Sequence, residues 1–262
     1  MQHLSKDPIP VLTNLHTINV VIWGVRLSLF LLHREYVNWK EWHFKLQEVD
    51  QRSKMSSKFS IWMSCTFFYA SLFMPCLYRM RQATTKANNS NKITTSFIVN
   101  LLPEKWKSPY WGSIGILGIF FQILGIIFES IADYQKATFK AKKVVLNPKS
   151  PNEKITFPNR NKWCNVGLWK YSTHPNYFGE ILFWIGTFVS GVGAMETFIQ
   201  YTVGIIGLIG IFVIIFGATE QLDQKQYLQY KKNLDFVQFR KTVGFMGPKI
   251  IKKGTKKTRQ KK

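Results

Sequence analysis

Cysteine is scarce in this chain of 262 residues. The three cysteines are Cys65, Cys76 and Cys164, and no two of them form a CxxC pair. They are too few and too widely spaced for a disulfide framework, so we interpret them as small packing residues. The sequence also shows no arrangement of side chains that predicts a metal site.

Acidic residues are also few. The chain has 14 Asp and Glu against 36 Lys and Arg, which gives a formal net charge of +22. Such a charge suits nucleic acid, but it is spread over loops and a tail, and no motif that reads RNA or DNA accompanies it. Attraction to anionic lipid headgroups explains it more simply, so we expect membrane lipids as partners and no nucleic acid.

Apolar residues, by contrast, are gathered into long runs. Hydrophobic residues make up 46% of the chain, with 21 Phe and 9 Trp. One run, 110–132, reaches about 34 Å as a helix, which exceeds the roughly 30 Å of a hydrocarbon core. We therefore expect an all-α, multi-pass transmembrane helix bundle of about five or more spans rather than a soluble protein. The five runs are 11–32, 59–78, 110–132, 178–194 and 197–217.

The basic residues are distributed unequally between the two sides of such a bundle. Of the 36 Lys and Arg, 28 fall in the loops 33–58 and 133–176 and in the tail from 218. Seven fall in the N-terminal segment and in the loop 79–109. The positive-inside rule then places the first group in the cytosol. We expect an integral protein of the endoplasmic reticulum membrane with a cytosolic C-terminus.

The stretch 167–180, GLWKYSTHPNYFGE, combines polar, aromatic and turn-forming residues directly before an apolar run. Pro175 suits the first turn of a helix, because the N–H that proline lacks has no partner there. Ser172 or Thr173 is expected to cap that turn. The simplest interpretation is a capped helix start with aromatic residues at the membrane interface.

Two polar residues of this stretch argue for more than a helix start. Asn176 and Glu180 are four residues apart, so they project from one face of the expected helix. An acid and an amide are costly to keep at the mouth of a membrane helix, which makes a functional role the better explanation.

A second polar stripe closes the third apolar run. Its members lie within about 60° of one another on a helical wheel, two acids followed by two bases. Ion pairing within the helix explains about 0.2–0.5 kcal/mol per pair, but not why acids sit at the end of an apolar run. The bases suit the phosphates of a dinucleotide and the acids suit ribose hydroxyls or an amide. These residues are Glu129, Asp133, Lys136 and Lys140.

The stretch 167–180 closely resembles the signature GLWxYSRHPNYFGE of the DUF1295 family, membrane proteins related to steroid 5-alpha-reductases and sterol reductases. Thr173 stands where the family usually has Arg. The segment 129–139 resembles the family's second signature, ExxADxQKxxF. Further on, Glu220 and the pattern of Tyr227 and Tyr230 resemble its closing segment.

This resemblance implies a membrane-bound reductase that uses NADPH to reduce a C=C bond of a lipid or steroid-like enone in a cytosolic cofactor cleft. Tyr227 and Tyr230 are then the candidate proton donors. The residues implied to bind the cofactor are Glu129, Asp133, Lys136, Lys140, Trp169, Tyr171, His174, Asn176, Tyr177, Glu180 and Glu220.

The resemblance also bears on the domain organisation. We expect one membrane-embedded, reductase-like domain over 1–248, with a shorter N-terminus than its relatives, and a basic disordered tail over 249–262. Within the last apolar run, Gly207 and Gly210 are three residues apart, and Gly210 and Gly217 are seven apart, which predicts close contact with another helix.

Two other functions fit some of the same residues. Membrane methyltransferases of the isoprenylcysteine carboxyl methyltransferase type carry a similar RHPxYxG element and bind S-adenosylmethionine. A non-catalytic membrane protein is the third possibility. The segment around Asp133 and the residues 176–180 favour the reductase.

Overall fold

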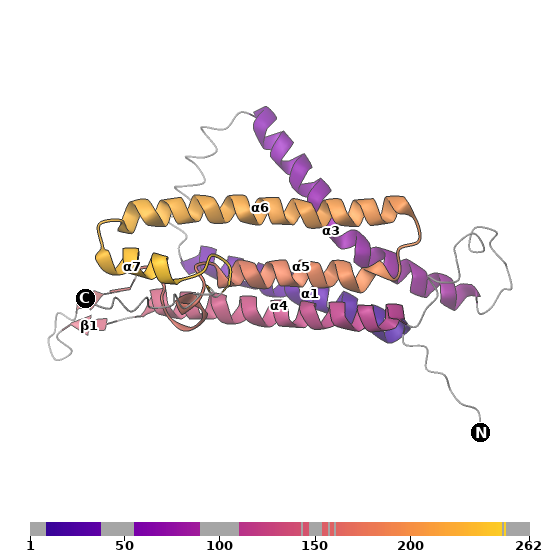
Figure 1. Ribbon diagram of the computed structural model, residues 1–262, viewed down its shortest axis with the longest axis horizontal. Helices are drawn as coiled ribbons and strands as arrows, with labels where there is room; N and C mark the ends of the chain where they lie inside the picture. The colour runs from indigo at the N-terminus through magenta and orange to yellow at the C-terminus, as the bar shows by residue number, and fades with distance from the viewer. Residues whose placement is uncertain are drawn as a thin grey trace, which may run out of the picture. The chain divides into compact units, whose positions relative to one another are not determined.

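The computed structural model describes residues 9–37, 55–89, 110–142, 144–146, 154–156, 158–159, 161–247 and 249. Helices dominate this part of the chain, as the sequence predicts, and Figure 1 shows their order. The six α-helices are α1 (Ile9–Val37), α3 (Met55–Asn89), α4 (Tyr110–Ala141), α5 (Pro175–Val192), α6 (Phe198–Tyr230) and α7 (Leu234–Thr242).

Four of these helices contain segments long and apolar enough to cross a membrane. The segments are Val11–Arg34, Lys58–Thr85, Gly112–Ala141 and Phe198–Tyr230. This is the pattern of an integral, multi-pass membrane protein. The compartment and the orientation inferred from the Lys and Arg distribution stay predictions.

The fifth expected span, 178–194, corresponds to α5, which is not among the candidate spans. The helix has 18 residues and its first turns are polar, so its apolar part is shorter than a hydrocarbon core. Its large side chains are also covered by protein: Phe183 is 0% exposed and Trp184 is 1% exposed. We therefore describe α5 as an interior helix of unit 1 over these residues, and its crossing of the membrane stays a prediction.

The fold class of the described residues is all-α, as expected, with a short β-hairpin in addition to the helices. Strands β1 (Val144–Leu146) and β2 (Lys154–Thr156) pair antiparallel, with Val145 opposite Ile155. They lie within 133–176, which the sequence predicts to be a loop. The predicted basic tail, 249–262, lies outside the described residues except for Lys249.

The contacts divide the chain into two compact units. Unit 1 comprises Met1–Ile126 and Glu180–Phe216, and unit 2 comprises Ile127–Gly179 and Gly217–Lys262. The expectation of one domain over 1–248 stays a prediction. Each unit is described separately below.

Aromatic rings form the core of unit 1. Trp23 of α1 stacks on Phe183 of α5 with ring centroids 5.2 Å apart. Trp184 meets Trp23 edge-on at 4.8 Å, and Phe73 of α3 meets Trp184 edge-on at 5.4 Å. Such offset and edge-to-face pairs add about 0.5–1.5 kcal/mol to the gain from burial. The rings therefore hold α1, α3 and α5 together.

Glycines let the helices of unit 1 approach closely. A Cβ atom at Gly207 would lie 2.7 Å from the backbone nitrogen of Leu72, and one at Gly210 would lie 2.3 Å from the Phe68 ring. The predicted close contact is thus confirmed at Gly207 and Gly210, with α3 as the partner. It is wrong at Gly217, where nothing lies within 4 Å of a Cβ atom. On α4, a Cβ at Gly118 would lie 2.2 Å from the backbone nitrogen of Ser190.

Gly118→Ala should therefore force α4 and α5 apart. We expect a loss of about 1–3 kcal/mol in the free energy of unfolding, because the clash is with backbone that cannot move aside alone. Gly24→Ala is the matched control, since nothing lies within 4 Å of a Cβ there. Thermal unfolding in detergent measures both; equal stability of the two variants would contradict the close packing.

Candidate functional site

The motif 167–180 begins with a turn that requires glycine. Gly167 has a φ of +54°, in the left-handed region that glycine adopts most readily. A Cβ here would also lie 2.3 Å from the side-chain amide of Gln135. That amide oxygen accepts a hydrogen bond of 2.8 Å from the backbone N–H of Leu168, the second residue of the 3-10 helix η3 (Gly167–Lys170). This hydrogen bond holds the start of the motif against the C-terminal part of α4.

Trp169 makes the second attachment to α4. Its indole N–H donates to the carbonyl of Ala132 at 2.9 Å, and the side chain is 3% exposed. The ammonium group of Lys136 lies over the ring, 4.6 Å from its centroid, which is cation–π geometry. The structure thus brings together Trp169 and Lys136, two residues predicted to bind the cofactor.

The middle of the motif is held by the segment that follows α7. The backbone N–H groups of Thr173 and His174 donate to the carbonyls of Gly244 and Phe245, at 2.9 and 3.2 Å. The hydroxyl groups of Ser172 and Thr173 both donate to the Phe245 carbonyl. The backbone N–H of Gly244 donates in return to the carbonyl of Tyr171, at 3.2 Å. Five hydrogen bonds therefore join two short stretches that are more than 70 residues apart in sequence.

The start of α5 agrees only partly with the sequence prediction. The helix begins at Pro175, as expected. The hydroxyls of Ser172 and Thr173, however, do not cap its first turn; Ser172 Oγ accepts instead from the N–H of His174, at 3.2 Å. Because α5 begins at Pro175, the residue that precedes its first turn is His174, and Ser172 and Thr173 lie too early in the chain to cap it. Their hydroxyl groups donate to the Phe245 carbonyl instead.

His174 belongs to a chain of three polar side chains. Its Nε2 lies 2.7 Å from Asp223 Oδ1. Arg240 donates to both oxygens of the same carboxylate, at 3.1 and 2.6 Å. In neutral His174 the Nε2 atom therefore carries the proton and donates it to Asp223, which leaves Nδ1 as the acceptor. The sequence prediction missed Asp223 and Arg240.

Burial lowers the pKa of His174 below its ordinary value of 6.5. The hydrogen bond to Asp223 and the charge of Asp223 oppose this shift, and Lys136 and Arg240 add to it. Because Arg240 already compensates the carboxylate, Asp223 does not hold a second proton on the ring. His174 is thus neutral at pH 7.

Asn176 and Tyr177 follow on the first turn of α5. The side-chain oxygen of Asn176 is buried and has no hydrogen-bond partner. Tyr177 stacks on His174 with ring centroids 5.7 Å apart and an interplanar angle of 25°. A buried acceptor without a partner is uncommon in native proteins, which makes Asn176 the most direct indication of a ligand in unit 2.

The acids of the α4 stripe are buried, whereas its bases are half-buried. Glu129 is 4% exposed and Asp133 is 7% exposed. Lys140 donates to the backbone carbonyl of Lys162. The stripe therefore faces protein along its whole length, as a functional or structural polar face requires.

The remaining predicted residues are dispersed. Tyr230 is half-buried, with its ring 5.7 Å from that of Trp163, whereas Tyr227 is 55% exposed. Tyr171 and Glu220 are exposed. Glu180 belongs to unit 1 and is not part of the site described here. Among the predicted proton donors, only Tyr230 has a side chain fixed by packing.

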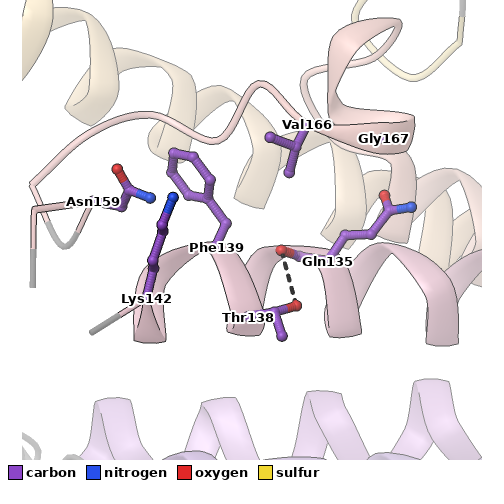
Figure 2. Close-up of a pocket in the computed structure, with 7 residues that line it drawn as sticks. All are labelled: Gln135, Thr138, Phe139, Lys142, Asn159, Val166 and Gly167. Carbon is purple, nitrogen blue, oxygen red and sulfur yellow. Dashed lines mark hydrogen bonds between the residues drawn. The ribbon is translucent and has the colours of Figure 1, made fainter. Parts of the chain in front are cut away.

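An open pocket of about 410 Å³ lies beside the start of the motif, as Figure 2 shows. Side chains of α4 form one wall, and the segment leading into the motif forms the other. A positive charge, Lys142, lies at its rim. None of the predicted site residues lines this pocket. The lining residues are Gln135, Thr138, Phe139, Lys142, Asn159, Val166 and Gly167.

The fold and this site define a multi-pass membrane protein with a polar motif at the start of an interior helix. The chain belongs to the DUF1295 family, described as a protein of unknown function, whose profile matches residues 6–243. It is 32% identical over 73 residues to an uncharacterized protein of Schizosaccharomyces pombe. That match spans 28% of this chain and 21% of the yeast protein. No solved structure matches the chain.

The neutral, buried state of His174 predicts a pH dependence of stability. Since the folded-state pKa is lowered, the unfolded chain takes up the proton first, so stability falls as pH drops below 6.5. His174→Gln keeps a donor for Asp223 but does not titrate, so its melting temperature should fall less between pH 7 and pH 5. Asn165→Ala, at an exposed position of unit 2, should retain the wild-type slope. If the melting temperature fell equally with pH in all three proteins, His174 would be ruled out as the titrating group.

Proposed function

We propose that this protein is a membrane-bound, NADPH-dependent reductase of a C=C bond in a lipid or steroid-like enone. The observation that carries the proposal is the buried, unpartnered oxygen of Asn176, two residues after a neutral histidine held in one tautomer. The kinship with steroid 5-alpha-reductases suggested by the motif is part of the same proposal.

The unpartnered oxygen fits a donor group of the cofactor. Asn176 Oδ1 would accept a hydrogen bond from the carboxamide N–H of nicotinamide or from a ribose hydroxyl. Leaving a buried acceptor unsatisfied costs about 1–3 kcal/mol, and a ligand that supplies the donor recovers that cost. The site is thus better satisfied with a hydrogen-bonding ligand than without one.

The charges near the site favour an anionic cofactor. Lys136 over Trp169 and Lys142 at the rim of the pocket are cations that phosphate groups would neutralise. The acids of unit 2 are less available: Asp133 is buried and Asp223 is bound by Arg240. S-adenosylmethionine has no phosphate and carries a sulfonium cation, so this balance of charges suits it less well.

The pocket of about 410 Å³ falls within the range of roughly 300–1,000 Å³ that ligand sites occupy. It is too small for a whole dinucleotide. We assign it to the phosphate-bearing, adenosine end of the cofactor, where the ammonium group of Lys142 would contact the anionic phosphate. Phe139 then offers an aromatic surface within the same pocket.

The protein's own residues would orient the reactants and move a proton. When bound, NADPH supplies the hydride, and the protein supplies position, charge and exclusion of water. Tyr230 is the better candidate for the proton donor, because Trp163 and Phe236 fix its ring, 5.7 and 5.3 Å away. The Asp223–Arg240 pair would keep His174 neutral, so that it adds no charge beside the substrate.

Ligand-dependent thermal stability tests the cofactor class. Purified protein in detergent should unfold at a higher temperature with NADPH than without it, because a ligand that binds only the folded state stabilises that state. S-adenosylmethionine at the same concentration should give a smaller shift. A shift with S-adenosylmethionine alone would favour the methyltransferase, and no shift with either would favour a non-catalytic protein.

Asn176→Ala tests the residue that carries the proposal. We expect about tenfold weaker NADPH binding, measured by titration of the melting temperature, from the loss of one hydrogen bond. Stability without ligand should be unchanged or higher, because the substitution removes an unsatisfied buried acceptor. Asn165→Ala, at an exposed position of unit 2, is the control and should bind as wild type does. Equal NADPH affinity of the two variants would remove Asn176 from the site.

A further inference from the structure

Unit 1 contains a second group of buried polar side chains, which the proposed function does not use. Arg79 lies inside α3 and is 6% exposed, although the distribution of basic residues assigned it to a loop. Its Nη2 donates to the backbone carbonyl of Ser190 on α5. A Cβ at Gly115 would lie 2.8 Å from the same atom, so the guanidinium group rests against the backbone of α4.

Four buried polar atoms around this guanidinium group have no hydrogen-bond partner. They are Nε of Arg79, Oγ of Ser190 and both ring nitrogens of His16. His16 and Ser190 are each 0% exposed. Buried polar groups are almost always paired, so four such atoms in one small region indicate that a polar ligand binds there.

Helix register shows that these atoms share one level of the bundle. A satisfied polar chain crosses unit 1: Asn19 donates to Gln122 at 3.3 Å, and Gln122 donates to Thr187 at 2.9 Å. His16 is three residues before Asn19, and Ser190 is three residues after Thr187. His16 and Ser190 therefore lie one helical turn from these hydrogen-bonded side chains, His16 on the same face of α1 as Asn19 and Ser190 on the same face of α5 as Thr187.

Contacts of α3 and α4 place Arg79 at that level. Thr17, next to His16, has its hydroxyl 3.8 Å from the sulfur of Cys76, one turn before Arg79. On α4, Gly118 is four residues before Gln122, and its α-carbon lies directly against Ser190. The unsatisfied atoms thus come from α1, α3 and α5 at one level of unit 1.

The positive charge of Arg79 indicates which kind of ligand would bind. Among the residues that the structure describes, Arg79 forms no ion pair. A buried cation without a counter-ion is costly in an apolar bundle, and an intramembrane charge usually marks a functional site. Arg79 Nε, Ser190 Oγ and one His16 nitrogen all offer hydrogen-bond donors. An oxyanion, with several acceptor lone pairs, satisfies all three.

The depth of the site suits an acidic lipid headgroup. Arg79 is six residues from the end of the segment Lys58–Thr85, and His16 is five residues from the start of Val11–Arg34. At 1.5 Å per residue, both lie within about 10 Å of a span end. That is close to the depth at which lipid phosphates and carboxylates meet the hydrocarbon core.

We propose that Arg79, Ser190 and His16 form an oxyanion-binding site for the carboxylate or phosphate group of an amphipathic lipid. The site is independent of the proposed reductase function. It would place an acidic headgroup against α3 and α5 and leave its acyl chain in the bilayer.

The test uses the full chain in detergent, after removal of endogenous lipid. Oleate and dioleoyl phosphatidic acid should each raise the melting temperature of the wild type, whereas oleyl alcohol, which lacks the charge, should not. Inorganic phosphate distinguishes the sources, because an equal shift with phosphate alone would assign the site to a free anion and overturn the lipid assignment. An equal shift with oleyl alcohol would show that the charge is irrelevant and overturn the site.

Variants locate the effect. Arg79→Gln should weaken the binding of oleate and phosphatidic acid by at least about tenfold. Ser190→Ala should weaken it by about fivefold. Ser190→Ala removes one small hydroxyl, so it keeps the test valid if Arg79→Gln does not fold. Arg81→Gln is the matched control, because Arg81 is exposed on the same helix. Wild-type affinity in both Arg79→Gln and Ser190→Ala, or equal losses in Arg81→Gln, would refute the proposal.

Discussion

The Asp223 carboxylate is the interaction on which the order of unit 2 depends. It accepts two hydrogen bonds from Arg240 and one from His174, and so connects α6, α7 and the motif before α5. Both oxygens of this half-buried acid are thus engaged, Oδ1 twice and Oδ2 once. Removing it would leave a cation and a buried imidazole without a partner, which costs more than the pair contributes when intact. The hydrogen bonds between the motif and residues 244–245 rely on the same placement of α7.

Both polar groups of the protein consist of a few charged or amide side chains held in apolar surroundings. In unit 2, Asp223, His174 and Arg240 satisfy one another, whereas Asn176 Oδ1 and the indole N–H of Trp163 are buried without a partner. In unit 1, Arg79 and His16 leave several atoms without partners in a closely packed bundle. Such groups are expensive to bury, and a ligand that completes them explains their presence better than stability does. The first group suits a nucleotide cofactor and the second an acidic lipid.

Local sequence rules predicted the helices well, because apolar runs and helix starts are local properties. The start of α5 at Pro175 and the close contacts at Gly207 and Gly210 follow from such rules. The rules failed where two segments compete for the same group. Ser172 carries the signature of a helix cap, yet its hydroxyl donates to Phe245, which no spacing in the sequence brings near.

The sequence alone determined the class of the protein: a basic, multi-pass membrane protein with the motif of one family, because composition and periodicity are sufficient for these. It also identified Trp169, Lys136 and His174 as residues of interest. Only the tertiary structure decided which partners they have, since Asp223 and Arg240 lie 49 and 17 residues from their respective partners along the chain. It likewise decided that Arg79 is buried in a helix, because burial depends on which backbones pack against it, and glycines of α4 that are distant in sequence allow that packing.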